Sequence, residues 1–258
     1  ICSGDAFSIT PSNAGNEIVP ANTTYTWTVV DNANPTIVAP AAMTVNTNTA
    51  CTATGVVLGT PVTNDNCTVA SVTNNAPVAF PLGNTTVTWT VTDGAGNTAT
   101  ATQVVSVVDN VNPTITAPAN ITTNATATCS VTGLTLGTPV TADNCSVASV
   151  TNNAPTTFPL GTTTVTWTVT DGSGHTATAT QTVTVVDNTN PTITAPANVT
   201  VNANSACAAF NVALGTPVTA DNCTVASVTN NAPTVFALGN TTVTWTVTDG
   251  AGHTTTAT

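Results

Sequence analysis

Apolar and polar residues alternate through residues 86–94, which read Thr-Val-Thr-Trp-Thr-Val-Thr-Asp-Gly. Val87, Trp89 and Val91 alternate with threonines, and this two-residue period predicts a β-strand with one apolar face and one threonine face. The Asp-Gly pair at its end indicates a turn. The same nine residues return at 164–172 and 242–250, an interval of 78 residues each time. The sequence therefore predicts three copies of one unit.

The three copies account for most of the 258 residues, with expected boundaries at 31–108, 109–186 and 187–258. Residues 1–30 do not match the unit and are expected either to end a preceding domain or to pack on the first copy. The third copy lacks the counterpart of the last half-strand of the second copy, so we expect a fragment of a longer chain. The junctions read Asp-Asn-x-Asn-Pro, and such short, proline-containing linkers favour a stiff joint.

The second copy illustrates the strands expected within each unit. A first strand covers about 114–123 and is interrupted by Pro118, which is typical of an edge strand. Further strands are expected near 129–136, 147–151, 164–170 and 175–186. Six or seven short strands in fewer than 80 residues predict an antiparallel β-sandwich. The sequence contains no amphipathic helical pattern and no apolar run long enough to span a membrane, so direct membrane insertion is not expected.

Composition supports a folded all-β chain and excludes several partners. Hydrophobic residues make up 41% of the sequence, and valine and threonine suit strands. The chain has no Lys or Arg and 11 acidic residues. Nucleic acid and anionic membrane surfaces are excluded as partners, because both are bound through basic side chains. The same composition predicts no salt bridge apart from one at the amino terminus.

Six of the seven cysteines form pairs separated by sixteen residues, one pair in each copy. Zinc sites need about four ligands, whereas each copy offers two cysteines and no nearby histidine. We therefore expect a disulfide inside each copy. Such a bond closes a loop of about 16 residues and stabilises the folded state by roughly 3 kcal/mol. The partner of Cys2 is expected upstream. The predicted pairs are Cys51 with Cys67, Cys129 with Cys145, and Cys207 with Cys223.

Nine of the eleven acidic residues recur at three places in each copy: the junction, a middle loop and the last hairpin. In an antiparallel sandwich these places lie at one end, so the three carboxylates of a copy should converge. No basic residue relieves their repulsion, and clustered oxygens suit Ca²⁺. Alternatively, Asp-Gly and Asp-Asn are simply turn formers that bond their own backbone. The trios are Asp31, Asp65 and Asp93; Asp109, Asp143 and Asp171; and Asp187, Asp221 and Asp249.

Other candidate residues point to structure rather than catalysis. Trp89, Trp167 and Trp245 alternate with apolar strand positions and are expected in the core. His175 and His253 occupy the hairpin position that Asn97 holds in the first copy, which argues against a catalytic or metal-binding role. No nucleophile, base and orienting carboxylate can be assembled, so an enzyme is not expected.

In combination, these motifs resemble the hyalin repeat, an immunoglobulin-like module of extracellular proteins. The resemblance covers 31–258 and rests on Asp-Asn-x-Asn-Pro, Asp-Asn-Cys, Phe-Pro-Leu-Gly at 158–161, and Val-Thr-Trp-Thr-Val-Thr-Asp-Gly-x-Gly. Residues 1–27 resemble the opening of a PKD-like domain, with Ile-Cys-Ser-Gly and Thr-Tyr-Thr-Trp. Together they are similar to giant SprB-type surface adhesins of gliding Bacteroidetes. The resemblance implies tandem immunoglobulin-like sandwiches arranged end to end, secretion and adhesion, and no catalysis.

Two functions are compatible with these observations. The first is a non-enzymatic stalk segment of an extracellular, cell-surface adhesin or filament, whose direct partners are neighbouring repeats of the same long chain. The alternative is a ligand-binding module for glycan or ice, in which the threonine faces, such as Thr88, Thr90 and Thr92, make the contacts.

Overall fold

The computed structural model describes residues 29–48 and 50–258, and all the regular structure in this part of the chain is β-strand. The chain divides into two compact units. One comprises the described residues up to Val111 together with Asn144–Ser146, and the other comprises Asn112–Asp143 and Val147–Thr258. The predicted PKD-like segment, residues 1–27, lies outside the described residues, and so does Cys2, for which an upstream partner was predicted. Within the described part, no helix is long and apolar enough to cross a membrane.

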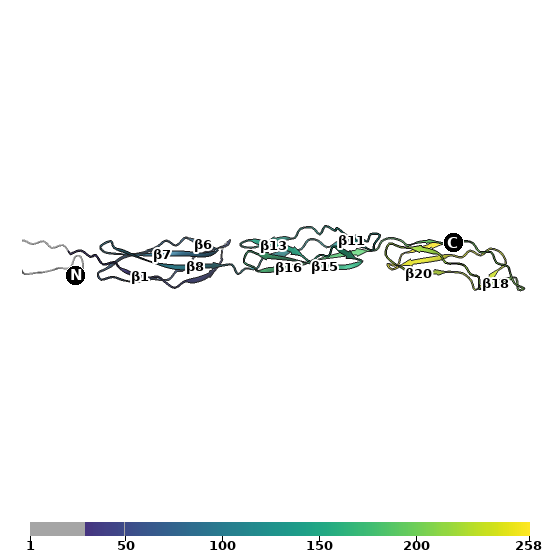
Figure 1. Cartoon of the computed structure of the whole chain (residues 1–258), viewed down its shortest axis with the longest axis horizontal. Coiled ribbons are helices and arrows are strands. Elements are labelled where there is room, and N and C mark those ends of the chain that lie inside the picture. Colours follow the sequence, from purple (N-terminus) through teal and green to yellow (C-terminus); the bar gives the residue numbers. More distant parts are fainter. Residues whose placement is uncertain (1–28, 49) are drawn as a thin grey trace, which may run out of the picture. The chain divides into compact units, whose positions relative to one another are not determined.

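The first copy forms a sandwich of one four-stranded sheet, in the order β2-β8-β7-β5, and two strand pairs, β1 with β4 and β3 with β6 (Figure 1). The long hairpin of β7 and β8 is its centre, and its residues are paired from Gly83 with Val107 to Thr92 with Thr98. The strands are β1 (Thr36–Val38), β2 (Met43–Asn46), β3 (Thr52–Thr54), β4 (Val62–Asn64), β5 (Val69–Asn74), β6 (Ala79–Pro81), β7 (Gly83–Asp93) and β8 (Thr98–Val108).

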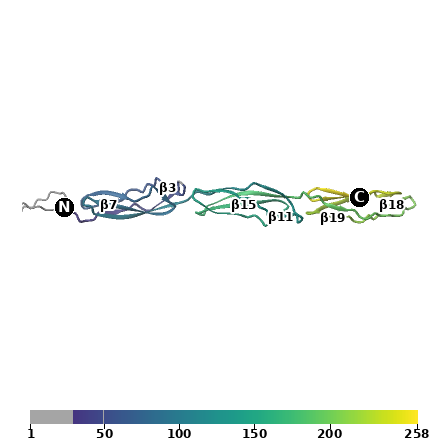
Figure 2. The same cartoon turned by 90° about the horizontal axis from the view of Figure 1, so that it is seen from above.

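The second copy repeats this arrangement, with the sheet β10-β16-β15-β13 and the pairs β9 with β12 and β11 with β14. Figure 2 shows β15 and β11 in the same copy from the perpendicular direction. Immunoglobulin-like sandwiches in tandem are the fold predicted from the sequence. The strands are β9 (Thr114–Thr116), β10 (Ile121–Asn124), β11 (Ser130–Thr132), β12 (Val140–Ala142), β13 (Val147–Asn152), β14 (Thr157–Pro159), β15 (Gly161–Asp171) and β16 (Thr176–Val186).

The alternating positions of β7 and β15 build the core, as their period predicts. Val87 and Val91 are fully buried and Trp89 is 6% exposed, and the same holds for Val165, Val169 and Trp167. Each core also contains one buried glutamine, for which the strand pattern gave no signal. Gln181 Oε1 accepts a hydrogen bond from Trp167 Nε1 at 3.1 Å, and its Nε2 donates to the carbonyls of Ala119 and Leu136 at 2.7 and 2.9 Å.

The predicted first strand of the second copy is two strands that join different sheets. β9 pairs with β12 in antiparallel orientation, whereas β10 pairs with the end of β16 in parallel orientation, with Ile121 opposite Val183. Pro118 lies between them, and because proline has no N–H it ends the first ladder where the chain crosses over. Each complete sandwich therefore contains one parallel pair among its antiparallel ladders.

The third copy is built on the same plan with shorter strands. β22 has five residues, compared with eleven in β7 and β15, and 197–204 contains no counterpart of β2 and β10. Its sheet is β20-β22-β23, with the pairs β17 with β19 and β18 with β21. The strands are β17 (Thr192–Thr194), β18 (Ala208–Phe210), β19 (Val218–Ala220), β20 (Val225–Asn230), β21 (Val235–Ala237), β22 (Trp245–Asp249) and β23 (Thr254–Ala257).

Candidate functional site

The hairpin aspartates Asp93, Asp171 and Asp249 are each 2% exposed, at the turn that follows the central strand. Asp93 Oδ1 accepts hydrogen bonds from the backbone N–H groups of Ala95 and Asn97 at 2.9 and 2.8 Å. Burial opposes ionisation, but the hydrogen bonds from Asn97, Ala95 and Gly96 together outweigh it and hold the pKa of this carboxyl below its ordinary value. The pKa values of Asp171 and Asp249 are lowered in the same way.

In the first and third copies, the glycine after the hairpin aspartate (Gly94 and Gly250) lies close to a neighbouring threonine. The N–H of Gly94 donates to the carbonyl of Thr68 at 3.0 Å, which ties the hairpin to the loop before β5. A Cβ on Gly94 would lie 2.8 Å from Thr68 Oγ1, too close for any other residue without a shift. The Asp-Gly motif therefore both caps the turn and allows this contact.

The residue four positions after each hairpin aspartate reaches back to its carboxylate. Asn97 Nδ2 donates to Asp93 Oδ2 at 2.8 Å, and His175 Nδ1 lies 2.9 Å from Asp171 Oδ2. The pair of His253 and Asp249 has the same geometry at 2.8 Å. These two His–Asp pairs are ion pairs when the histidine is protonated. The expectation of no salt bridge beyond the amino terminus was therefore wrong, because it counted only Lys and Arg.

The junction and middle-loop aspartates join the hairpin aspartate at one end of the sandwich. In the first copy, carboxylate oxygens of Asp31, Asp65 and Asp93 lie within 4.8 Å of one another. Asn97 holds the junction in place, since its Nδ2 also donates to the carbonyls of Asp31 and Ala33 at 3.1 and 3.2 Å. The trio predicted from the sequence thus forms a compact group in the first copy.

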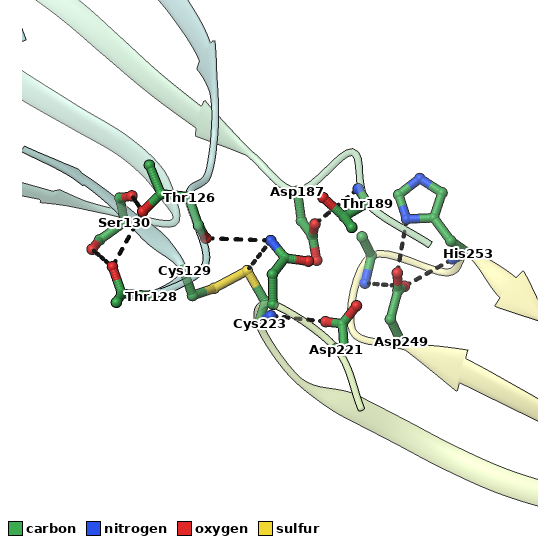
Figure 3. The surroundings of a disulfide bond; sticks show 12 residues. Thr126, Thr128, Cys129, Ser130, Asp187, Thr189, Asp221, Cys223, Asp249 and His253 are labelled. Carbon is green, nitrogen blue, oxygen red and sulfur yellow. Dashed lines mark hydrogen bonds and ion pairs between the residues drawn. A yellow bond between two sulfur atoms is a disulfide. The ribbon is translucent and has the colours of Figure 1, made fainter. Parts of the chain in front are cut away.

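Both readings of the aspartates, turn formation and cation binding, find support in the third copy. Asp187 Oδ1 accepts from the N–H of Thr189 at 3.1 Å, and Asp221 Oδ2 accepts from the N–H of Cys223 at 2.8 Å, which are turn contacts. The other oxygens, Asp187 Oδ2 and Asp221 Oδ1, are buried and have no hydrogen-bond partner among the described residues, and Asn222 Oδ1 is in the same situation. Figure 3 shows Asp187, Asp221 and Asp249 gathered beside a disulfide.

These oxygens form a group that is rich in hydrogen-bond acceptors and poor in hydrogen-bond donors. Asp187 is 8% exposed and Asp249 is 2% exposed, and the three carboxylates offer oxygens within 4.8 Å of one another. Unpaired buried carboxylate oxygens are costly. The donor set of carboxylate and amide oxygens fits a hard divalent cation. In the second copy, Asp109 belongs to the first unit, whereas Asp143 and Asp171 belong to the second.

The two disulfides between described cysteines join neighbouring copies and do not lie within one copy. Cys51 is bonded to Cys145 and Cys129 to Cys223, each across 94 residues of sequence. Cys67 is also in a disulfide, and Cys207 is a free, exposed thiol. The predicted pairs Cys51–Cys67, Cys129–Cys145 and Cys207–Cys223 were therefore wrong.

The two cysteines of one copy lie at opposite ends of its sandwich. Cys51 follows Thr47, whose N–H donates to the carbonyl of Val108 at the end of β8. Cys67 precedes Thr68, whose carbonyl accepts from Gly94 in the turn that leads into β8. The eleven residues of β8 separate these ends by about 33 Å, whereas a disulfide requires Cα atoms within about 7 Å. The equal spacing of the two cysteines in each copy therefore predicted the wrong disulfide pairing.

Polar contacts accompany the bonds between copies. Within the first unit, Asn144 Nδ2 donates to Thr47 Oγ1 at 3.1 Å and to Asp109 Oδ1 at 3.2 Å. In the second unit, Asn222 Nδ2 lies 3.5 Å from the carbonyl of Thr126 and 3.6 Å from the sulfur of Cys223 (Figure 3). The asparagine before each of these cysteines thus bonds the copy that precedes its own: Asn144 bonds Thr47 and Asp109, and Asn222 bonds Thr126.

The threonine faces lie on the outer side of the four-stranded sheet. Thr88, Thr90 and Thr92 are half-buried between β5 and β8, and they stand opposite threonines of β8. A binding role for this face stays a prediction.

Part of the chain matches a known protein family. Residues 108–185 match the HYR domain. Hyalin of Strongylocentrotus purpuratus is 33% identical over 174 residues, which are 64% of this chain and 14% of hyalin. Both matches support a hyalin repeat. The chain thus spans about a seventh of the curated relative that it matches.

Solved structures with tandem β-sandwiches are also similar to the chain. The mouse cadherin-23 EC22-24 structure is 13% identical, with a TM-score of 0.38, and the match covers 86% of this chain and 97% of that one. The protocadherin GammaB4 extracellular domain is 12% identical, with a TM-score of 0.36, covering 88% of this chain and 48% of that one.

Proposed function

We propose that the chain is a non-enzymatic structural stalk segment of an extracellular, cell-surface adhesin or filament, and that it bears tension. The observation that carries this proposal is the overlap of the two disulfide loops. Cys129 lies inside the loop that Cys51 and Cys145 close, and Cys145 lies inside the loop that Cys129 and Cys223 close. The hyalin match and the resemblance to SprB-type adhesins of gliding bacteria support the extracellular setting.

Overlapping loops shorten the covalent path along which force travels. That path follows the chain from residue 1 to Cys51, crosses to Cys145, runs back to Cys129, crosses to Cys223 and continues to residue 258. It contains no more than about 100 residues, or about 360 Å when fully extended, compared with about 900 Å for the 258-residue chain. The long hairpins of the first two copies, β7–β8 and β15–β16, lie outside this path, so their unfolding adds no length to it.

Stretching single molecules by their termini tests this function. The oxidised chain should reach a contour length of no more than about 360 Å, and reduction should raise it to about 900 Å. The matched controls are the double variant Cys51→Ser with Cys145→Ser, which removes one bond, and Cys207→Ser, which removes only the free thiol. An oxidised chain that extends to its full length would refute a tension-bearing stalk of this design.

We propose further that the aspartate groups of the first and third copies bind Ca²⁺. In the third copy, Asp187 Oδ2, Asp221 Oδ1 and Asn222 Oδ1 are the buried acceptors that need a partner, and Asp249 would add the third carboxylate. A cation here would connect the linker, the loop before β20 and the β22–β23 hairpin. It would supply positive charge, which no Lys or Arg of this chain provides.

Thermal unfolding in EDTA and in calcium tests the cation. At 10 mM Ca²⁺, one site with a dissociation constant near 0.1 mM should raise the free energy of unfolding by about 2.7 kcal/mol. Sodium chloride of equal ionic strength should not reproduce the effect. Asp221→Asn should weaken the response, whereas Glu17→Gln, which makes the same charge change outside the trios, should not. Equal melting in EDTA and calcium would leave the aspartates as turn formers.

A further inference from the structure

The disulfide between Cys129 and Cys223 adjoins the aspartate group of the third copy (Figure 3). Asp221 and Asn222 directly precede Cys223 in the sequence. Asp221 supplies one carboxylate of the trio, and Asn222 Oδ1 is a buried acceptor with no hydrogen-bond partner among the described residues. The loop before β20 therefore contains a disulfide cysteine and two oxygen ligands of the proposed cation site within three consecutive residues.

Cys223 holds the side chains of both residues before it. Its N–H donates to Asp221 Oδ2 at 2.8 Å, while the other oxygen of that carboxylate, Oδ1, is buried and has no partner in the described part of the chain. Its sulfur accepts a hydrogen bond from Asn222 Nδ2 at 3.6 Å. Since the oxygen and nitrogen of an amide point in different directions, this bond turns Asn222 Oδ1 away from the sulfur. The position of Cys223 therefore orients two ligand oxygens.

Cys129, at the other end of the disulfide, lies in the loop that follows β10. At the start of this loop, the N–H of Ala125 donates to the carbonyl of Val186, the last residue of β16, at 2.8 Å. Asp187 follows Val186 directly in the sequence. The disulfide thus links the strand end that carries Asp187 to the loop that carries Asp221.

The trio is assembled from both sides of this junction. Asp187 belongs to the linker after the second copy, whereas Asp221 and Asp249 belong to loops of the third copy, and the three offer oxygens within 4.8 Å of one another. Their charges repel, so the loops tend to separate when nothing holds them. A closed disulfide restricts this movement before the cation arrives, and such preorganisation raises affinity.

We propose that the Cys129–Cys223 disulfide controls the cation affinity of the third copy, so that closure of the bond and binding of Ca²⁺ favour each other. This inference rests on the proposed Ca²⁺ site. The coupling is reciprocal: the factor by which the closed bond raises the affinity is also the factor by which the cation favours the closed bond. A dithiol opens the bond by giving two electrons and two protons to its sulfurs, which become thiols, while the dithiol becomes a disulfide. Bound Ca²⁺ should oppose this reaction.

The test uses the full chain with Asp65→Asn and Asp143→Asn, a background in which only the third of the three trios keeps all its carboxylates. Calorimetric titration of this oxidised chain with Ca²⁺ gives the affinity of the third copy. The same titration of variants in this background then shows what each disulfide contributes to that affinity.

Removing the bond with Cys129→Ser and Cys223→Ser together should weaken Ca²⁺ binding about tenfold. The matched control is Cys51→Ser with Cys145→Ser, which removes a disulfide of the same sequence separation, 94 residues, away from the third trio. This control should bind Ca²⁺ as tightly as the background chain.

The reciprocal measurement keeps all cysteines. The oxidised background chain is equilibrated with reduced and oxidised dithiothreitol, its thiols are alkylated, and mass spectrometry measures the opened fraction of each bond. Saturating Ca²⁺ should lower the equilibrium constant for opening Cys129–Cys223 about tenfold relative to EDTA. Opening of Cys51–Cys145 in the same sample should not depend on Ca²⁺, and adding Asp221→Asn should remove the effect at Cys129–Cys223.

The outcomes separate the coupling from the site itself. Equal Ca²⁺ affinities with and without the Cys129–Cys223 bond, or equal opening of that bond in Ca²⁺ and EDTA, would overturn the coupling and leave the Ca²⁺ site in place. An oxidised chain that binds no Ca²⁺ would overturn both. If the double serine variant does not fold, the opening measurement decides alone, because it needs no cysteine substitution.

Discussion

At the scale of single residues, the hairpin aspartates are buried carboxylates held by several hydrogen bonds. Asp93 accepts three hydrogen bonds, from the N–H groups of Ala95 and Asn97 and from the side chain of Asn97. These contacts favour the ionised carboxylate and so hold its pKa below the ordinary value despite burial. Folding is therefore linked to the charge of this group.

Stability should fall as the pH drops below the ordinary pKa of aspartate, about 3.9. Because the pKa of Asp93 is lowered in the folded state, its contribution is complete above the unfolded-state pKa and disappears as the pH falls through the folded one. Urea unfolding in EDTA between pH 6 and pH 2 measures this. Asp93→Asn should be less stable at pH 6 and less sensitive to acid, whereas Glu17→Gln should follow the parent chain. An unchanged pH dependence in Asp93→Asn would contradict the linkage.

At the scale of elements, the buried glutamine joins parts of the sandwich that no ladder connects. Gln181 lies in β16, and its amide reaches the loop between β9 and β10 and the loop between β11 and β12. It also fixes the indole of Trp167 on the neighbouring β15. One side chain thus holds both sheets together at the point where the first strand changes sheet.

Gln181→Leu should destabilise the second copy by about 2–4 kcal/mol, because three buried polar groups lose their partner while the volume is kept. Thr178→Val, at an exposed position of the same strand, is the matched control and should change stability by less than about 0.5 kcal/mol. Urea denaturation of the oxidised chain gives both values. Equal effects of the two substitutions would show that the glutamine network is not needed.

At the scale of the whole molecule, the two disulfides between described cysteines, Cys51–Cys145 and Cys129–Cys223, each span 94 residues instead of the sixteen expected from the sequence. In chain-entropy theory a loop of this length stabilises by about 4.7 kcal/mol, compared with about 3 kcal/mol for the short loop. The same conformation recurs at all three cysteines of this type, whose φ angles are 63°, 54° and 58° at Cys51, Cys129 and Cys207. Cys207 thus has the same backbone conformation as the disulfide-bonded Cys51 and Cys129, but its thiol is free.

Cleavage before aspartate maps these bonds, because it places each cysteine after Cys2 in its own fragment. Without reductant, mass spectrometry should find 31–64 joined to 143–170 and 109–142 joined to 221–248. Iodoacetamide added beforehand should label Cys207 in 187–220 and leave the joined fragments unlabelled. A link between 109–142 and 143–170 would restore the pairing within one copy.

Residue order alone determined the long hairpin strands, their buried faces and the turns that end them. The alternation around Trp167 predicts both a strand and its buried face, because a period of two is a local property of extended backbone. The convergence of Asp31, Asp65 and Asp93 also followed, since antiparallel connections place alternate loops at one end. Tertiary structure decided what depends on distance. Cys51 and Cys67 are near in sequence but about 33 Å apart, because β8 lies between the ends that hold them. The buried Gln181 and the parallel pairing of β10 likewise arise only once the two sheets are packed together.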